Sequence, residues 1–214
     1  SAASKNQWSE CLSYATKSVS LEPLQQAGYF FAWMACDQLA RHEEAFSWLD
    51  QMPPSKGTNS LELDLFVDEN ERLHYLIKAA EKVSNPARAF QESEQLLLWY
   101  KHNGGSDADT LLQKLIIQSL EQNKIHQARD YMRQLLQLSL QPNLSGERWQ
   151  IIDELLSLFI EKKEYTFAIQ AYVDLFDNNI QKSTTQRRLV GLYIKTNQIA
   201  KARSLSNNSQ VFFK

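Results

Sequence analysis

An alanine recurs along this chain at intervals of 44, 39, 40 and 34 residues, each time near the start of a helix-favouring segment that follows a turn. The five positions are Ala45, Ala89, Ala128, Ala168 and Ala202. Two antiparallel helices cross closely near their turn only where the side chain between them is small. The spacing therefore predicts a series of helical hairpins, with each alanine near the start of the second helix. Larger residues at these five positions should destabilise the stack.

The composition favours an all-α fold. The 214 residues include only 6 Gly and 5 Pro, while Leu (29) and Gln (20) far outnumber Val (6). Straight side chains favour helices, whereas β-branched ones favour strands. Breaker residues at Pro23, 53–57, 85–86, 103–105, 142–146 and 177–179 divide the chain into helical segments. We expect one domain over 1–214, with a half-repeat at 8–23 and hairpins at about 26–53, 68–102, 109–141, 149–179 and 183–208.

The unit that begins at Trp149 carries the fullest repeat pattern, with Phe159, Tyr165, Ala168 and Tyr172 following it. This spacing of small and aromatic residues resembles the tetratricopeptide repeat (TPR) family. The resemblance implies a right-handed α-α superhelix, a TPR-like solenoid of antiparallel helical hairpins. The repeats are degenerate, since the first-helix position that faces each alanine is large. These large residues are Trp33, Ile77, Ile116, Leu156 and Val190.

The N-terminal segment 8–23 resembles a second helix that lacks its partner, with Cys11 at the alanine position and Pro23 closing the unit. The chain also begins Ser-Ala-Ala-Ser without a methionine. Together these features predict a fragment of a longer protein.

Charge and cysteine content limit the partners and the compartment. The net charge is −2, from 23 basic and 25 acidic residues, so nothing favours nucleic-acid binding. The longest apolar stretch, 28–36, is too short to span a bilayer, and we expect no membrane insertion by this chain. Cys11 and Cys36 are interpreted as small buried apolar residues, with one disulfide as the alternative.

No local pattern predicts catalysis, a cofactor or a metal. The four histidines, His42, His74, His102 and His126, include no pair at metal-ligand spacing. The segment 41–45 begins like a zinc-protease helix, but Phe46 occupies the place of the second histidine. The glycines at 104–105 lack the Lys-Ser or Lys-Thr of a phosphate loop and predict a helix-ending turn. We therefore expect no enzyme, although residues distant in sequence could still converge.

The TPR resemblance implies a concave groove lined by five positions of each first helix. Carried over to this sequence, the groove is polar with apolar spots. The candidate partner-binding residues are Phe30, Met34, His74, Lys78, Gln113, Ile117, Asp153, Ser157 and Arg187. Family members that clamp a carboxylate have recurrent Lys and Asn residues at the fifth and ninth positions of the first helices. The fifth position here reads Phe30, His74, Gln113, Asp153 and Arg187, so we do not expect a carboxylate clamp. Phe30 and Met34, one turn apart, are better suited to anchor a partner helix, unless they pack against the preceding lone helix.

These features favour a non-catalytic protein–protein interaction scaffold that binds a partner protein or peptide on the concave face. One alternative is the repeat domain of a bacterial envelope or exopolysaccharide-export protein, or the effector-sensing arm of a regulator. Another is an all-α enzyme. The sequence leaves the compartment, cytoplasmic or periplasmic, open.

Overall fold

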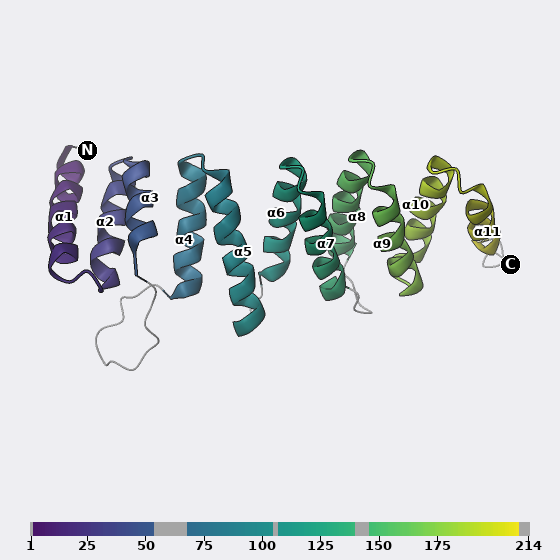
Figure 1. Ribbon diagram of the computed structural model, residues 1–214, viewed down its shortest axis with the longest axis horizontal. Coiled ribbons are helices and arrows are strands. Elements are labelled where there is room, and N and C mark those ends of the chain that lie inside the picture. Colours follow the sequence, from purple (N-terminus) through teal and green to yellow (C-terminus); the bar gives the residue numbers. More distant parts are fainter. Residues whose placement is uncertain (1, 54–67, 105–106, 140–145, 210–214) are drawn as a thin grey trace. The chain divides into compact units, whose positions relative to one another are not determined.

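The computed structural model describes residues 2–53, 68–104, 107–139 and 146–209. These residues form eleven α-helices (Figure 1). They are α1 (Ala2–Leu21), α2 (Gln26–Gln38), α3 (His42–Gln51), α4 (Glu69–Lys82), α5 (Pro86–Asn103), α6 (Ala108–Glu121), α7 (Ile125–Ser139), α8 (Gly146–Glu161), α9 (Tyr165–Asp177), α10 (Lys182–Lys195) and α11 (Ile199–Ser209). After α1, successive helices pair into antiparallel hairpins (Figure 1). The predicted fold class, an all-α arrangement of antiparallel helical hairpins, is confirmed.

The helices group into two compact units, Ser1–Gly105 and Ser106–Lys214. In the first unit, each of α1 to α4 packs on the next helix along the chain. In the second unit, the hairpins α6/α7, α8/α9 and α10/α11 are joined by packing of α6 on α8, α7 on α9 and α9 on α10. The single domain expected over 1–214 stays a prediction.

The five alanines lie where the repeat predicts them. Each is the fourth residue of the second helix of its hairpin, in α3, α5, α7, α9 and α11. Their exposed fractions lie between 0% and 5%. The hairpins therefore share one packing position, and the sequence identified it because a close helix crossing leaves room only for a small side chain.

The turn inside each hairpin repeats as closely as the alanine does. Five residues before each alanine, the backbone adopts a left-handed conformation, with φ between 53° and 64°. These residues are Ala40, Ser84, Asn123, Lys163 and Asn197. The next residue donates its N–H to a carbonyl five positions back, as Arg41 does to Cys36 at 2.8 Å. This is the Schellman helix end, where glycine is the usual residue. None of the five residues is glycine, and only the turn at Ser84, next to Asn85 and Pro86, coincides with a predicted breaker.

Gly104 is the predicted helix-ending glycine that the structure describes. It has φ 75° and donates its N–H to the Tyr100 carbonyl at 2.9 Å. The breakers expected at Pro54, Gly57, Gly105 and Pro142 lie outside the described residues. Asn85 and Pro86 begin α5 as its N-cap and first helical residue, and the Asn85 side chain accepts the Arg88 N–H.

The N-terminal half-repeat is longer than predicted, and its crossing residue is a different one. The helix α1 begins at Ala2, and Ala15, not Cys11, is its buried small residue. Ala15 lies one turn further along the helix than Cys11, where α1 meets Gly28 of α2. A Cβ on Gly28 would lie 2.8 Å from Val19 Cγ2 and 3.4 Å from the Ala15 carbonyl oxygen. The prediction for Cys11 is therefore wrong, because glycine on the neighbouring helix sets the closest approach.

The two cysteines are free thiols in the structure. Cys36 is buried, as predicted, and burial raises the pKa of its thiol, with a smaller contribution from Glu44. Cys11 is only half-buried. Among the described residues, no helix combines the length and the apolar character needed to cross a membrane.

Candidate functional site

Four aromatic side chains of the first unit gather where α2 faces α4. We call Phe30, Phe31, Trp33 and Tyr75 the aromatic cluster. The ring centroids of Trp33 and Tyr75 lie 4.7 Å apart, and those of Phe30 and Trp33 lie 5.2 Å apart. Phe30 also lies 5.9 Å from Tyr75 and 6.0 Å from Phe31. The tilted and edge-on geometries are those that aromatic pairs prefer.

The aromatic cluster rests on a buried layer formed by Tyr29, Leu49, Met52, Leu76 and Ala79. Phe30, Trp33 and Tyr75 pack against this layer while remaining partly exposed. Phe31 is 39% exposed. The cluster thus packs on the buried layer and still presents part of its rings to solvent, an arrangement that can receive an apolar group of another molecule.

The four candidate residues of the first unit lie on the helices α2 and α4 that form the aromatic cluster. Phe30 belongs to the cluster, and its ring packs against Tyr75 of the following hairpin. Met34, one turn later on α2, is half-buried. His74 is half-buried and its Nε2 lies 3.1 Å from the Tyr100 hydroxyl of α5. Lys78 is exposed on α4.

In the second unit, Asp153 belongs to a hydrogen-bonded network inside the chain. The Tyr172 hydroxyl donates to Asp153 Oδ1 at 2.6 Å, and Arg188 Nε donates to the same oxygen at 2.9 Å. Tyr172 is fully buried, and burial first, then the Asp153 hydrogen bond, raises the pKa of its hydroxyl far above the ordinary value. The network joins α8 to α9 and α10.

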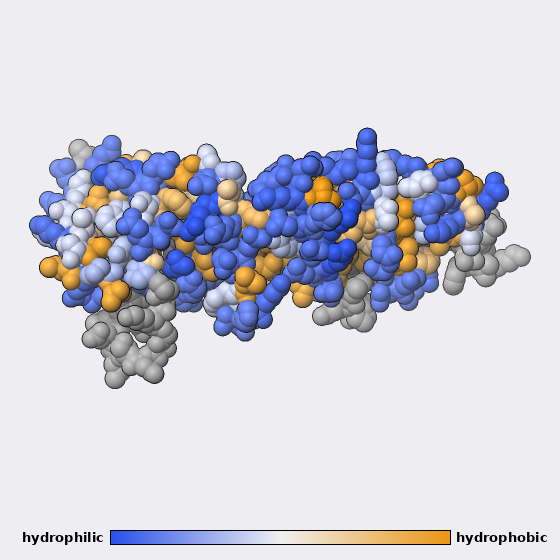
Figure 2. Space-filling view, viewed as in Figure 1, coloured by the Kyte–Doolittle hydropathy of each residue, from blue (hydrophilic) through white to orange (hydrophobic). Residues whose placement is uncertain are grey.

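The other candidate residues of the second unit lie on three helices and are half-buried or exposed. Gln113 and Ser157 are half-buried, and the Ser157 hydroxyl donates to the Asp153 carbonyl at 2.8 Å. Arg187 is exposed. Ile117 is 40% exposed. These side chains are spread over α6, α8 and α10, and on the face shown in Figure 2 hydrophobic residues form separate patches between hydrophilic ones.

Ion pairs connect successive hairpins in both units. Between first helices they join Asp37 to Lys82 (2.5 Å), Asp109 to Arg148 and Asp153 to Arg188. Between second helices or their ends they join Asp50 to Arg88 and Arg129 to Glu164. Asp153, the one carboxylate among the candidate residues, is thus already paired within the chain, which favours the apolar side chains as binding groups.

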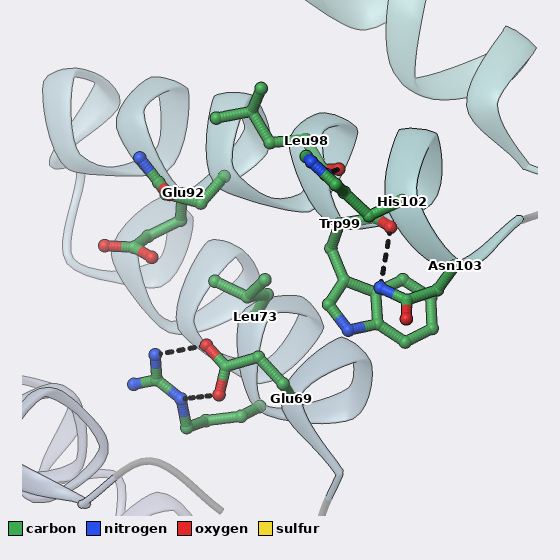
Figure 3. A pocket seen from close by; sticks show the side chains of 9 residues that line it. Glu69, Leu73, Glu92, Leu98, Trp99, His102 and Asn103 are labelled. Carbon is green, nitrogen blue, oxygen red and sulfur yellow. Dashed lines mark hydrogen bonds and ion pairs between the residues drawn. The ribbon is translucent and has the colours of Figure 1, made fainter.

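A pocket of about 600 Å³ lies between α4 and α5 in the first unit (Figure 3). Its lining consists of Glu69, Arg72, Leu73, Glu92, Gln95, Leu98, Trp99, His102 and Asn103. Figure 3 shows Glu69 and Glu92 toward one end and Trp99 toward the other, with Leu73 between them. The pocket therefore combines two carboxylates, the Arg72 guanidinium and the His102 imidazole with the apolar side chains of Leu73, Leu98 and Trp99.

The carboxylates at the pocket belong to a wider charged group. Arg72 donates to both oxygens of Glu69, at 2.8 and 2.7 Å. Arg88 forms ion pairs with Asp50 and, at 2.9 Å, with Glu92. The Glu92 side chain is only 6% exposed. Its burial raises the pKa of the Glu92 carboxyl, against the opposing effect of Arg88 and Arg72.

The sequence predicts Phe30 and Met34 as an apolar anchor, but it gave no indication that Trp33 and Tyr75 lie beside Phe30. It also missed the pocket, because Glu92 reads as an ordinary surface charge in a helix. Glu92 lies on the same face of α5 as the buried Ala89 and Leu96, three residues after one and four before the other. This helical spacing could have indicated that Glu92 is buried. Among the described residues, no group of His, Cys, Asp or Glu side chains is arranged to hold a metal ion.

The sequence matches no protein-family model and no curated protein. Its fold is similar to those of several solved structures. MamA of AMB-1 is 12% identical with a TM-score of 0.44, and the match covers 88% of this chain and 92% of MamA. BtubC (BKLC) from P. vanneervenii is 13% identical with a TM-score of 0.44, and the match covers 96% of this chain and 88% of BtubC. A chain of the APC/C hetero-tetramer Cut9-Hcn1 is 16% identical with a TM-score of 0.36, and the match covers 95% of this chain and 38% of that chain.

Proposed function

We propose that this chain is a non-catalytic scaffold that binds a partner protein or peptide through the first helices of its hairpins, with the aromatic cluster as the main anchor. The observation that carries the proposal is the packing of Phe30, Trp33 and Tyr75 against a buried layer while the cluster stays open to solvent. Aromatic side chains held in this way dominate the energy of many protein interfaces.

The aromatic cluster is already ordered by its neighbours, and this favours binding. Phe30 and Trp33 are one turn apart on α2, and both contact Tyr75 on α4, so few rotamers are left to fix when a partner arrives. A side chain that is already immobilised does not lose that entropy a second time on association. An apolar helix face or an extended apolar segment would fit such a surface.

The proposal is tested with a photoreactive residue placed at two positions of the full chain. p-Benzoylphenylalanine replaces Phe31 in one variant and Leu138 in the other. Leu138 is a matched control, because it is 44% exposed but lies on α7 in the second unit. Irradiation in an extract of the source cells is followed by mass spectrometry of the adducts.

We expect position 31 to capture one discrete polypeptide that position 138 does not capture. Capture should also fall at least several-fold when Phe30→Ala is added, while circular dichroism shows that the variant remains folded. Equal adducts from both positions, or capture that is indifferent to Phe30→Ala, would refute the aromatic cluster as the anchor.

A further inference from the structure

The charged group beside the α4/α5 pocket is unbalanced. Three carboxylates, Asp50, Glu69 and Glu92, share two guanidinium groups, Arg72 and Arg88. Asp50 and Glu69 are partly exposed, so water solvates part of their charge. Glu92 is the most buried of the five, and its pKa is raised by that burial. The group thus carries one negative charge in excess, and its least solvated member lines the pocket.

The shape of the pocket suits a long side chain with a charged end. The carboxylates of Glu69 and Glu92 lie toward one end, Leu73 lies in the middle, and the Trp99 indole lies toward the other end (Figure 3). Arginine and lysine have this pattern, an apolar stem that covers hydrophobic surface and a cationic head that seeks polar groups. Arginine adds a planar fork that can bind carboxylates in pairs.

We propose that the α4/α5 pocket receives a basic side chain of the partner polypeptide, arginine in preference to lysine. This inference rests on the proposed function and adds the chemistry of the partner to it. The guest's cation lies at the end of the pocket that holds Glu92, beside the Arg72–Glu69 ion pair, and balances the excess charge. Its stem lies along Leu73 and Trp99.

Two further observations indicate a polypeptide of basic character. Residues 1–105 contain nine Lys and Arg against fourteen Asp and Glu, a net charge of −5, which attracts a basic partner. Leu98, another lining residue of the pocket, is 47% exposed. An exposed leucine beside the pocket offers an apolar contact to the chain that carries the basic residue, which a free polyamine would not use.

The experiment uses the full chain labelled with 5-fluorotryptophan, so that its five tryptophans give separate fluorine signals that Trp→Phe variants assign. The probes are acetyl-Gly-Arg-Gly-amide, its lysine analogue, its citrulline analogue and spermidine. Citrulline keeps the shape of arginine and removes its charge. We expect the arginine peptide to shift the Trp99 signal and leave the Trp149 signal unchanged, with the lysine peptide weaker and the citrulline peptide inactive.

Glu92→Gln should weaken the arginine peptide at least fivefold, and Glu69→Gln, at a less buried site, should do so to a smaller extent. Glu71→Gln removes the same charge from the exposed surface of α4 and should have no effect. Thermal melts check that each variant folds. If Glu92→Gln fails to fold, the test is whether Glu69→Gln weakens binding of the arginine peptide more than Glu71→Gln does.

The pocket proposal is wrong if citrulline shifts Trp99 as arginine does, or if Glu71→Gln weakens binding as much as Glu92→Gln. Tighter binding of spermidine than of the arginine peptide would assign the pocket to a free polyamine and also overturn it. The capture experiment at position 31 does not use the pocket. If position 31 captures a partner but the arginine peptide does not bind, the pocket proposal alone is refuted. If the arginine peptide binds but position 31 captures no partner, the aromatic cluster alone is refuted.

Discussion

The two units share one hairpin geometry but differ in charge and in aromatic content. Residues 1–105 have a net charge of −5, whereas residues 106–214 carry fourteen Lys and Arg against eleven Asp and Glu, a net charge of +3. Four of the five tryptophans lie in the first unit, which also contains the aromatic cluster and the pocket. In the second unit, Asp153 accepts hydrogen bonds from the buried Tyr172 of its own hairpin and from Arg188 of the next hairpin. The repeated geometry depends on a few small residues and turns, which leaves the remaining positions to diverge.

The largest expected effect comes from the buried alanines at the helix crossings, which both units share. Ala89→Leu in the first unit and Ala128→Leu or Ala168→Leu in the second should each lower the free energy of unfolding by about 1–3 kcal/mol, because a leucine overpacks a helix crossing that has no free space. Chemical denaturation of the three variants measures the loss. Midpoints equal to that of the parent chain would show that these alanines do not set the crossing.

Substitution of one glycine in each unit should have opposite effects on stability. Gly28→Ala in α2 should destabilise by about 1–2 kcal/mol, because the new Cβ would collide with Val19 of α1. Gly191→Ala in α10 meets nothing within 4 Å, so its better helix propensity should stabilise by up to about 1 kcal/mol. Denaturation curves of the two variants give the comparison. A neutral or stabilising effect of Gly28→Ala would mean that α1 does not approach α2 as closely as the structure describes.

Tyr172→Phe tests the buried network of the second unit. Loss of the hydroxyl removes the 2.6 Å hydrogen bond to Asp153 and should cost about 1 kcal/mol, while Arg188 keeps the carboxylate paired. The absorbance change on alkaline titration should also show that Tyr172 ionises only after the exposed tyrosines, because burial raises its pKa. A variant as stable as the parent would place Tyr172 outside the network.

The smallest effect is a pH dependence that belongs to the first unit. Burial raises the pKa of Glu92 in the folded chain, so between that pKa and the ordinary value of about 4.3 the folded state binds more protons than the unfolded state. The stability contributed by Glu92 therefore increases as the pH falls through this window. Glu92→Gln should remove the increase, seen as the difference between denaturation curves at pH 7 and pH 5. An unchanged difference would mean that Glu92 is not desolvated.

The hairpins could be predicted because they depend on local and regular features. Ala45, Ala89, Ala128, Ala168 and Ala202 repeat within a helical pattern, so their burial followed from spacing alone. The lone helix α1 had no such series, and Cys11 was placed at the crossing instead of Ala15. The aromatic cluster could not be predicted, because Phe30 and Tyr75 lie 45 residues apart and meet through stacking of hairpins. The pocket depends on ion pairs from α3, α4 and α5, which sequence spacing does not specify.

The central claim is that the first unit, through its aromatic cluster, holds the partner. Isothermal titration of the captured polypeptide into full-length variants tests it most directly. Phe30→Ala with Phe31→Ala removes two rings of the aromatic cluster. Leu138→Ala with Ile199→Ala removes apolar side chains from second helices of the second unit, α7 and α11, where they are 44% and 40% exposed. We predict at least a tenfold loss of affinity for the first pair and less than twofold for the second. A greater loss for the second pair would contradict the account.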